Sequence, residues 1–207
     1  MKKNTLVILS LISVLSLSLS VNAAIDVKSG IKAGVQASLA NSNTTTANTA
    51  VINSYKSQIK SLVSKSNSVS TKFNTAVNNV SNLLMSKNEI SNIKGSLPAN
   101  SAEATDKLVT YLISGGNSAT LSKRVSSLSA DKKAQLTTQI NTIKTSVVEY
   151  TNVMKQATTL SANIAKTPSV AVVLSPELKS LKQVSANASN QAKNASKLST
   201  ALLGFKK

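Results

Sequence analysis

Residues 47–93 carry the longest regular apolar pattern of this chain and read ANTAVINSYKSQIKSLVSKSNSVSTKFNTAVNNVSNLLMSKNEISNI. With Ile52 taken as heptad position a, ten of the twelve a and d positions are apolar. The a positions are Ile52, Ile59, Ser66, Phe73, Val80 and Lys87, and the d positions are Tyr55, Leu62, Val69, Ala76, Leu83 and Ile90. Since no proline or glycine interrupts the pattern, it predicts one helix over residues 48–93.

The apolar face of this helix is wider than the seam of a two-stranded coiled coil. Val63, Val77 and Leu84 add a row at position e. A face of this width favours packing against two or more helices. Lys87 interrupts the apolar a row, but a lysine near a helix end can carry its ammonium to solvent on its long stem.

A second long helix is predicted over residues 130–166. Ser129 and Asp131 suit its start, and Thr167-Pro168 marks its end. Eight of its nine a and d positions are apolar: Leu136, Ile140, Ile143, Val147, Tyr150, Met154, Ala157 and Ile164, with Ser161 as the exception. Val153 and Leu160 widen its face as well. The two long helices are therefore expected to pack together.

Two further helical regions complete the pattern. Residues 101–127 form two short helices separated by Gly115-Gly116, and Asn100 with Glu103 fits a capping box at their start. Ser175-Pro176-Glu177 begins a last helix over residues 176–203. Its apolar row is rich in alanine, namely Leu178, Leu181, Val184, Ala188, Ala192, Ala195, Leu198 and Leu202. The sum is an all-α fold: an elongated antiparallel bundle of about four helices with coiled-coil-like packing.

The first 47 residues differ from the rest. Residues 1–23 combine a basic start, a short apolar run and small residues before Ala24, which is typical of a cleaved signal peptide. Residues 24–47 read as a weak amphipathic helix followed by a Thr/Asn-rich linker. Residues 48–207 are expected to form a single helical bundle domain. We therefore expect an exported protein, in the periplasm or outside the cell.

The chain is strongly basic, with 24 Lys and Arg against seven Asp and Glu and a formal net charge of +17. Removal of residues 1–23 would take away two basic residues and leave a net charge of +15. Such a charge draws a protein to anionic surfaces, including lipid headgroups, lipopolysaccharide and acidic polymers. The alternative is that scattered lysines only keep the protein soluble.

The residue types that are missing limit the chemistry. The chain contains neither His nor Cys, so it cannot form Ser-His triads, thiolate nucleophiles or the usual zinc sites. The seven acidic residues are dispersed, and Glu103 and Asp106 suit the first turn of a helix better than an acid/base pair. We expect no catalytic, cofactor-binding or metal-binding residues and no enzymatic activity. With five aromatic residues, specific nucleic acid binding is not expected.

Two groups of residues are candidates for contact with a partner. Lys123 and Arg124 lie close in sequence to Lys132 and Lys133 across the turn at Ser129, so the four could contact an anionic partner. The apolar run 170–174 could contact a membrane or a protein partner through Val170, Val172, Val173 and Leu174. The alternative for this run is a crossover that closes one end of the helical core.

These features favour a non-enzymatic interaction or scaffold module of the bacterial envelope, with diffuse positive charge for an anionic component or membrane surface. Self-association is also open, because wide apolar stripes can be buried within one chain or between chains. One alternative is a secreted, membrane-active helical protein of the pore-forming kind. Another is a periplasmic holdase chaperone: the chain is similar to small basic coiled-coil chaperones in export signal, charge and helix length, but lacks their strand-rich segment.

Overall fold

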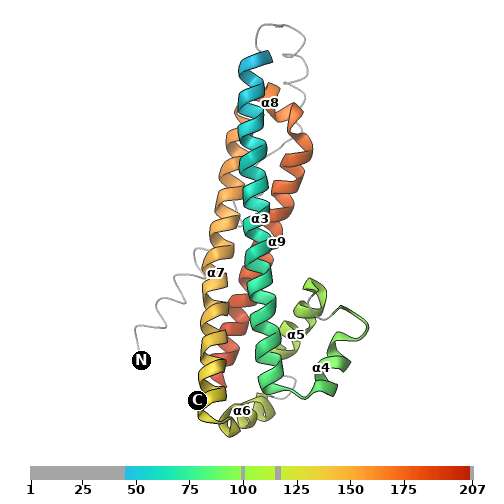
Figure 1. Ribbon diagram of the computed structural model, residues 1–207, viewed down its shortest axis with the longest axis vertical. Coiled ribbons are helices and arrows are strands. Elements are labelled where there is room, and N and C mark those ends of the chain that lie inside the picture. The colour runs from blue at the N-terminus through green and yellow to red at the C-terminus, as the bar shows by residue number, and fades with distance from the viewer. Residues whose placement is uncertain (1–44, 99–100, 115–117, 206–207) are drawn as a thin grey trace. The chain divides into compact units, whose positions relative to one another are not determined.

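The structure is a computed structural model that describes residues 45–98, 101–114 and 118–205. Within these ranges the chain forms seven helices and no strand, which confirms the all-α prediction (Figure 1). The helices are α3 (Thr45–Leu84), α4 (Lys87–Lys94), α5 (Ala102–Ser114), α6 (Ser118–Ser127), α7 (Ala130–Ala165), α8 (Pro168–Val173) and α9 (Ser175–Gly204). The predicted signal peptide and the weak helix after it lie outside the described residues.

The chain divides into two compact units. The first contains the described residues through Ser64 together with Thr151–Ser189, and the second contains Lys65–Tyr150 and the described residues from Asn190 onward. The three long helices α3, α7 and α9 contribute to both units, whereas α4, α5 and α6 belong to the second and α8 to the first. The prediction of one domain over residues 48–207 stays a prediction.

The buried side chains of α7 match its predicted heptad positions. All nine of its predicted a and d side chains are buried, as are Val153 and Leu160. The helix also ends where Thr167-Pro168 predicted, at Ala165. Burial along α9 follows its predicted row too, except at Val184, which is half-buried. These stripes are read correctly from sequence because apolar periodicity in a long helix is a local signal.

The prediction of one helix over residues 48–93 is wrong. Helix α3 begins at Thr45 and ends at Leu84, and the shorter helix α4 starts at Lys87. Ser86 is the N-cap of α4: its backbone is extended, and it forms a capping box with Glu89. As a result Lys87 is the exposed first residue of α4, not an a position of a long rod.

The structure corrects two shorter features. The cap of α5 is Ser101, whose Oγ accepts a hydrogen bond from the backbone N–H of Ala104 at 3.1 Å. This is one residue later than the predicted Asn100, which lies outside the described residues. The apolar run after Pro168 forms the extra helix α8, because proline at the first position fits a helix start. The described part of the chain thus has two helices, α4 and α8, that were not expected as separate elements.

In the second unit, α3 and α7 run in opposite directions. Lys72 and Phe73 of α3 contact Glu149 and Tyr150 of α7, while the later residue Asn79 donates to the earlier Gln139 at 3.4 Å. Helix α5 joins this unit through Asp106. Its Oδ1 accepts hydrogen bonds from the side-chain amides of Gln191 at 3.1 Å and Asn194 at 3.4 Å, both on α9.

In the first unit, Lys56 of α3 forms an ion pair with Glu177 of α9 at 3.7 Å. Val170, Ala171 and Leu174 of the α8 region are buried. Among the described residues, none of the helices has the length and apolar character needed to span a membrane.

Candidate functional site

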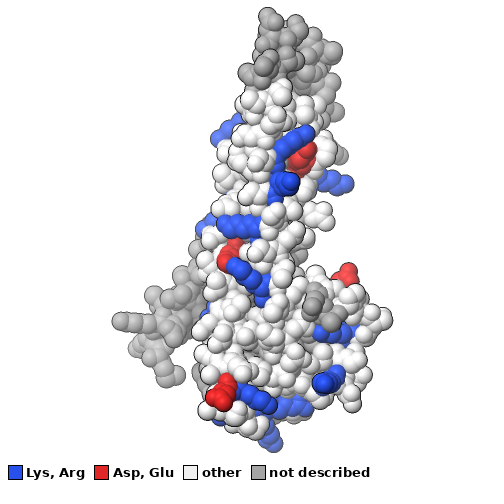
Figure 2. Space-filling view, viewed as in Figure 1, with Lys and Arg blue, Asp and Glu red and all other residues white. Residues whose placement is uncertain are grey.

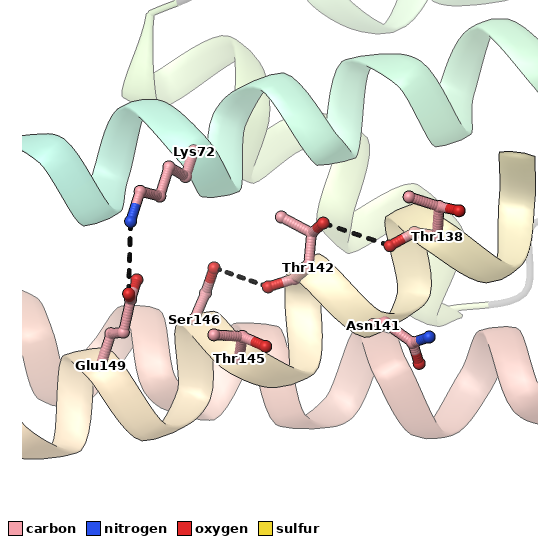
Figure 3. A pocket seen from close by; sticks show the side chains of 7 residues that line it. All are labelled: Lys72, Thr138, Asn141, Thr142, Thr145, Ser146 and Glu149. Atoms are coloured by element: carbon pink, nitrogen blue, oxygen red, sulfur yellow. Dashed lines mark hydrogen bonds and ion pairs between the residues drawn. The ribbon is translucent and has the colours of Figure 1, made fainter.

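A shallow polar groove lies beside α7 in the second unit (Figure 3). Its volume is about 300 Å³, and it is lined by Lys72 of α3 and by Thr138, Asn141, Thr142, Thr145, Ser146 and Glu149 of α7. The α7 residues recur every three or four positions, which places them on one face of the helix. The groove is therefore a stripe of hydroxyl and amide groups closed on one side by α3.

Most of the hydroxyl protons in the groove are already used within α7. Thr142 Oγ1 donates to the carbonyl of Thr138 at 3.1 Å, and Ser146 Oγ donates to that of Thr142 at 2.9 Å. Thr138 in turn donates to the carbonyl of Ala134 at 3.2 Å. Asn141 and Thr145 are exposed at the rim. The groove can accept hydrogen bonds from a polar ligand, but it has few donors to offer.

The ion pair between Lys72 Nζ and Glu149 Oε1, at 3.3 Å, lies in this groove. Because the two charges neutralise each other, the groove presents no net charge to an ionic ligand. Glu149 is the only carboxylate in its lining, so a paired acid/base mechanism has no second group here. Among the described residues, moreover, we find no cluster of three or more acidic side chains suited to a metal ion.

The four basic residues predicted from sequence are in different environments. Lys123, Lys132 and Lys133 are exposed on α6 and on the first turn of α7. Ser129 caps α7 by accepting a hydrogen bond from the N–H of Lys132 at 3.4 Å. Arg124 is only partly exposed, and its guanidinium is engaged within the protein. The three lysines are thus the members of the predicted cluster with freely accessible side chains.

Arg124 connects α6 to the junction between α3 and α4. Its Nη1 donates to Glu89 Oε2 and its Nη2 to Glu89 Oε1, each at 3.0 Å. Nη1 also donates to the backbone carbonyl of Leu84 at 2.9 Å. These bonds, helped by those from Ser86, hold the pKa of Glu89 at about 2, and the same contact raises the pKa of Arg124. The geometry assigns Arg124 a structural role that the sequence analysis missed.

Lys94 is a second basic residue with an unexpected position. It is the last residue of α4 and is buried, and its Nζ donates to Asn78 Oδ1 of α3 at 2.6 Å. Burial lowers the pKa of its ammonium group. This contact is not visible in the sequence, where Lys94 looks like an ordinary basic residue in the last turn of a helix.

The predicted apolar contact region at 170–174 contains both buried and exposed side chains. Val170 and Leu174 are fully buried, Val172 is half-buried, and Val173 is 52% exposed. The first two fill the core of the first unit. Contact with a membrane or partner stays a prediction, and the side chains available for it are Val172 and Val173.

Comparison with known proteins adds no assignment: neither a family model, nor a curated protein, nor a solved structure matches this chain. The function is therefore argued from the chain itself.

Proposed function

We propose that this protein is a non-enzymatic, exported interaction module that binds an anionic partner of the bacterial envelope through diffuse positive charge. The observation that carries the proposal is that exposed lysines outnumber the acidic residues that could balance their charge. These lysines occur on α3, α6, α7 and α9, and include Lys60, Lys123, Lys132, Lys144, Lys155, Lys182 and Lys197. Figure 2 shows Lys and Arg scattered over the visible face with few acidic residues among them.

Ion pairs within the chain leave this excess of positive charge unchanged, because each pair uses one basic and one acidic residue. Of the chain's seven acidic residues, Glu89, Glu149 and Glu177 are each paired with a basic residue of the same chain. These carboxylates are not available to balance the remaining lysines. A field of one sign over a protein surface attracts polyanions and anionic membranes in a salt-dependent way.

Export is part of the proposal and rests on the pattern of residues 1–23. Expression of the full chain in a bacterial host, followed by cell fractionation and mass spectrometry, tests it. We expect a product that begins at Ala24 in the periplasm or the medium. A full-length product confined to the cytoplasm would contradict export.

The elongated, antiparallel, coiled-coil-like bundle predicted from the heptads is also part of the proposal. The burial of the heptad positions of α7 supports it, as does the opposite direction of α3 and α7 in the second unit. Small-angle X-ray scattering tests the shape. A compact globule of the 184 residues after Ala23 has a radius of gyration of about 16 Å, and we expect a clearly larger value.

The binding experiment is sedimentation of the purified protein with neutral and with anionic lipid vesicles, at low and at high salt. We expect binding to anionic vesicles only, and its loss at high salt. Parallel measurements use lipopolysaccharide, an acidic polysaccharide and DNA of unrelated sequences. Absence of binding to all of these polyanions at low salt would exclude the proposal.

Two triple variants distinguish diffuse from localised binding. The first replaces Lys123, Lys132 and Lys133 by Gln, and the second replaces Lys60, Lys155 and Lys182, which are also exposed. Both remove the same charge. Equal weakening is expected for diffuse attraction, whereas a loss confined to the first variant would locate the site at the turn between α6 and α7.

The same experiment separates the alternatives. Salt-resistant binding with release of a trapped dye would favour the membrane-active protein of the pore-forming kind. Failure to bind polyanions, combined with suppressed aggregation of a denatured outer-membrane protein, would favour the holdase chaperone.

A further inference from the structure

The bend between α3 and α4 is not required by a helix-breaking residue. No proline or glycine occurs between Ala47 and Lys94, and the apolar heptads continue across the bend. Helical hydrogen bonds are present on both sides, from Met85 N–H to the carbonyl of Ser81 and from Ile90 N–H to that of Ser86. The N-cap Ser86 has an extended backbone, with φ −73° and ψ 158°. To join α3 and α4 into one continuous helix, only the few backbone dihedral angles around Ser86 have to change.

Side chains replace the backbone hydrogen bonds that the bend removes. Glu89 Oε2 accepts from the backbone N–H of Ser86 at 2.7 Å, and Ser86 Oγ accepts from the N–H of Glu89 at 3.3 Å. Arg124 donates to the carbonyl of Leu84 at the end of α3. Glu89 and Arg124 are also bound to each other, so one ion pair supports both ends of the bend.

Helix α4 also packs against α5, but it buries few of its own side chains. Its only buried residue is Lys94, while Ile90 and Ile93 are half-buried. Helix α5, by contrast, buries five residues, among them Leu108 and Leu112. Figure 1 shows α4 turned away from the axis of α3, with α5 beside it. The position of α4 therefore depends strongly on the polar contacts of Glu89 and Lys94.

We propose that the contact of Arg124 with Glu89 and Leu84 is a latch that keeps α4 bent, and that its release lets α3 continue through Lys94 as one helix. The continuous form regains the backbone hydrogen bonds between residues 82–85 and 86–89. It loses the capping box, the Arg124 contacts, the bond from Lys94 to Asn78 and the packing of α4 against α5. In the bent form, side chains satisfy the N–H groups of Ser86 and Glu89 and the carbonyl of Leu84. At these three groups the two forms exchange side-chain partners for backbone partners, as in a two-state element.

The distance between spin labels on α3 and α4 tests the proposal. Thr75→Cys and Asn92→Cys place the labels at exposed positions, and the chain has no other cysteine. In one continuous helix these Cα atoms are about 26 Å apart, and in the bent form they are closer. We expect a single shorter distance in the otherwise unaltered protein. Arg124→Gln and, separately, Glu89→Gln should add a population near the longer distance.

Lys87→Pro is the control that separates straightening from unfolding of α4. Lys87 is the first residue of α4, where proline is accepted, and the extended Ser86 before it has the backbone that a following proline prefers. Inside a continuous helix the same proline is strongly unfavourable. Adding Lys87→Pro to Arg124→Gln should therefore remove the longer population and restore the shorter one.

Two results would overturn the latch. One is an unchanged distance distribution in both Arg124→Gln and Glu89→Gln, each shown by circular dichroism to be folded. The other is a longer population that persists when Lys87→Pro is added, because a continuous helix cannot account for it.

Discussion

Phe73 and Tyr150 form an aromatic pair in the core of the second unit. Their ring centroids are 6.0 Å apart at an interplanar angle of 79°, an edge-to-face arrangement that aromatic rings favour. Phe73 is fully buried, and the hydroxyl of Tyr150 donates to Ser70 Oγ at 3.2 Å. The pair packs α3 against α7 at one predicted heptad position of each helix.

Phe73→Ala should lower the free energy of unfolding by about 3 to 5 kcal/mol, because it removes the ring and leaves a cavity. Urea denaturation at neutral pH measures the change. Thr75→Ala, at an exposed position of the same helix, is the control and should stay within about 0.5 kcal/mol of the unaltered protein. A small effect of Phe73→Ala would mean that the ring is not packed as described.

Ionisation of Tyr150 is expected to lower the free energy of unfolding at alkaline pH. Burial raises the pKa of its phenol to about 12, although the hydrogen bond to Ser70 lowers it in part. The contribution of the neutral phenol is complete below its ordinary pKa of 10.0 and is lost as pH rises towards 12. Tyr150→Phe lacks this ionisation. The stability difference between the unaltered protein and Tyr150→Phe should therefore shrink from pH 9 to pH 11.

All other ionisable groups are the same in both proteins, so their effects on stability largely cancel in the difference. Urea denaturation of both proteins at matched pH values gives the measurement. A difference that stays constant with pH would show that Tyr150 ionises as easily in the folded protein as in the unfolded chain.

At the scale of elements, the alanines of α9 set how closely other helices approach it. Ala192 and Ala195 are fully buried in the middle of the helix. A small side chain there allows close packing of the backbone, so a larger one must displace its neighbours. The composition of this stripe therefore has a packing role rather than marking a weak part of the fold.

Ala192→Leu should destabilise the protein by about 1 to 3 kcal/mol through overpacking. Ala186→Leu, on the same helix but exposed, makes the same change in volume and should have little effect. Thermal denaturation of the two variants side by side is the measurement. Equal behaviour of the two variants would contradict the close packing at Ala192.

Elements also show where sequence reading is limited. The capping box of Ser86 and Glu89 is visible in the sequence, but so is an uninterrupted heptad pattern across the same residues. Local signals favour both a stop and a continuation at this point. The contact with Arg124, which is distant in sequence, adds hydrogen bonds to the bent form alone. The end of α3 was therefore not predictable from its own residues.

For the molecule as a whole, the net charge of +17 predicts self-repulsion. Salt screens like charges on the surface, so the folded state should gain stability as ionic strength rises. Thermal denaturation in 10 mM and 500 mM sodium chloride measures the effect. A melting temperature that falls with sodium chloride would indicate that the three surface ion pairs outweigh the repulsion.

The groove illustrates what single helices cannot reveal. The spacing of Thr138, Asn141, Thr142 and Thr145 on one face of α7 is readable from the sequence. Its closure by Lys72 depends on the pairing of α3 with α7, which residue spacing alone does not specify. In the same way, the sequence shows the four basic residues of the predicted cluster, but not the neutralisation of Arg124 by Glu89.

The sequence by itself determined the helical class, the extent of α7 and α9, and the core stripes along them. Apolar period, caps and proline stops act over a few residues, so each is readable without the rest of the chain. Only the tertiary structure decided where α3 ends and which basic side chains stay exposed. Those outcomes depend on Arg124 meeting Glu89, 35 residues away in the chain, and no local pattern carries that information.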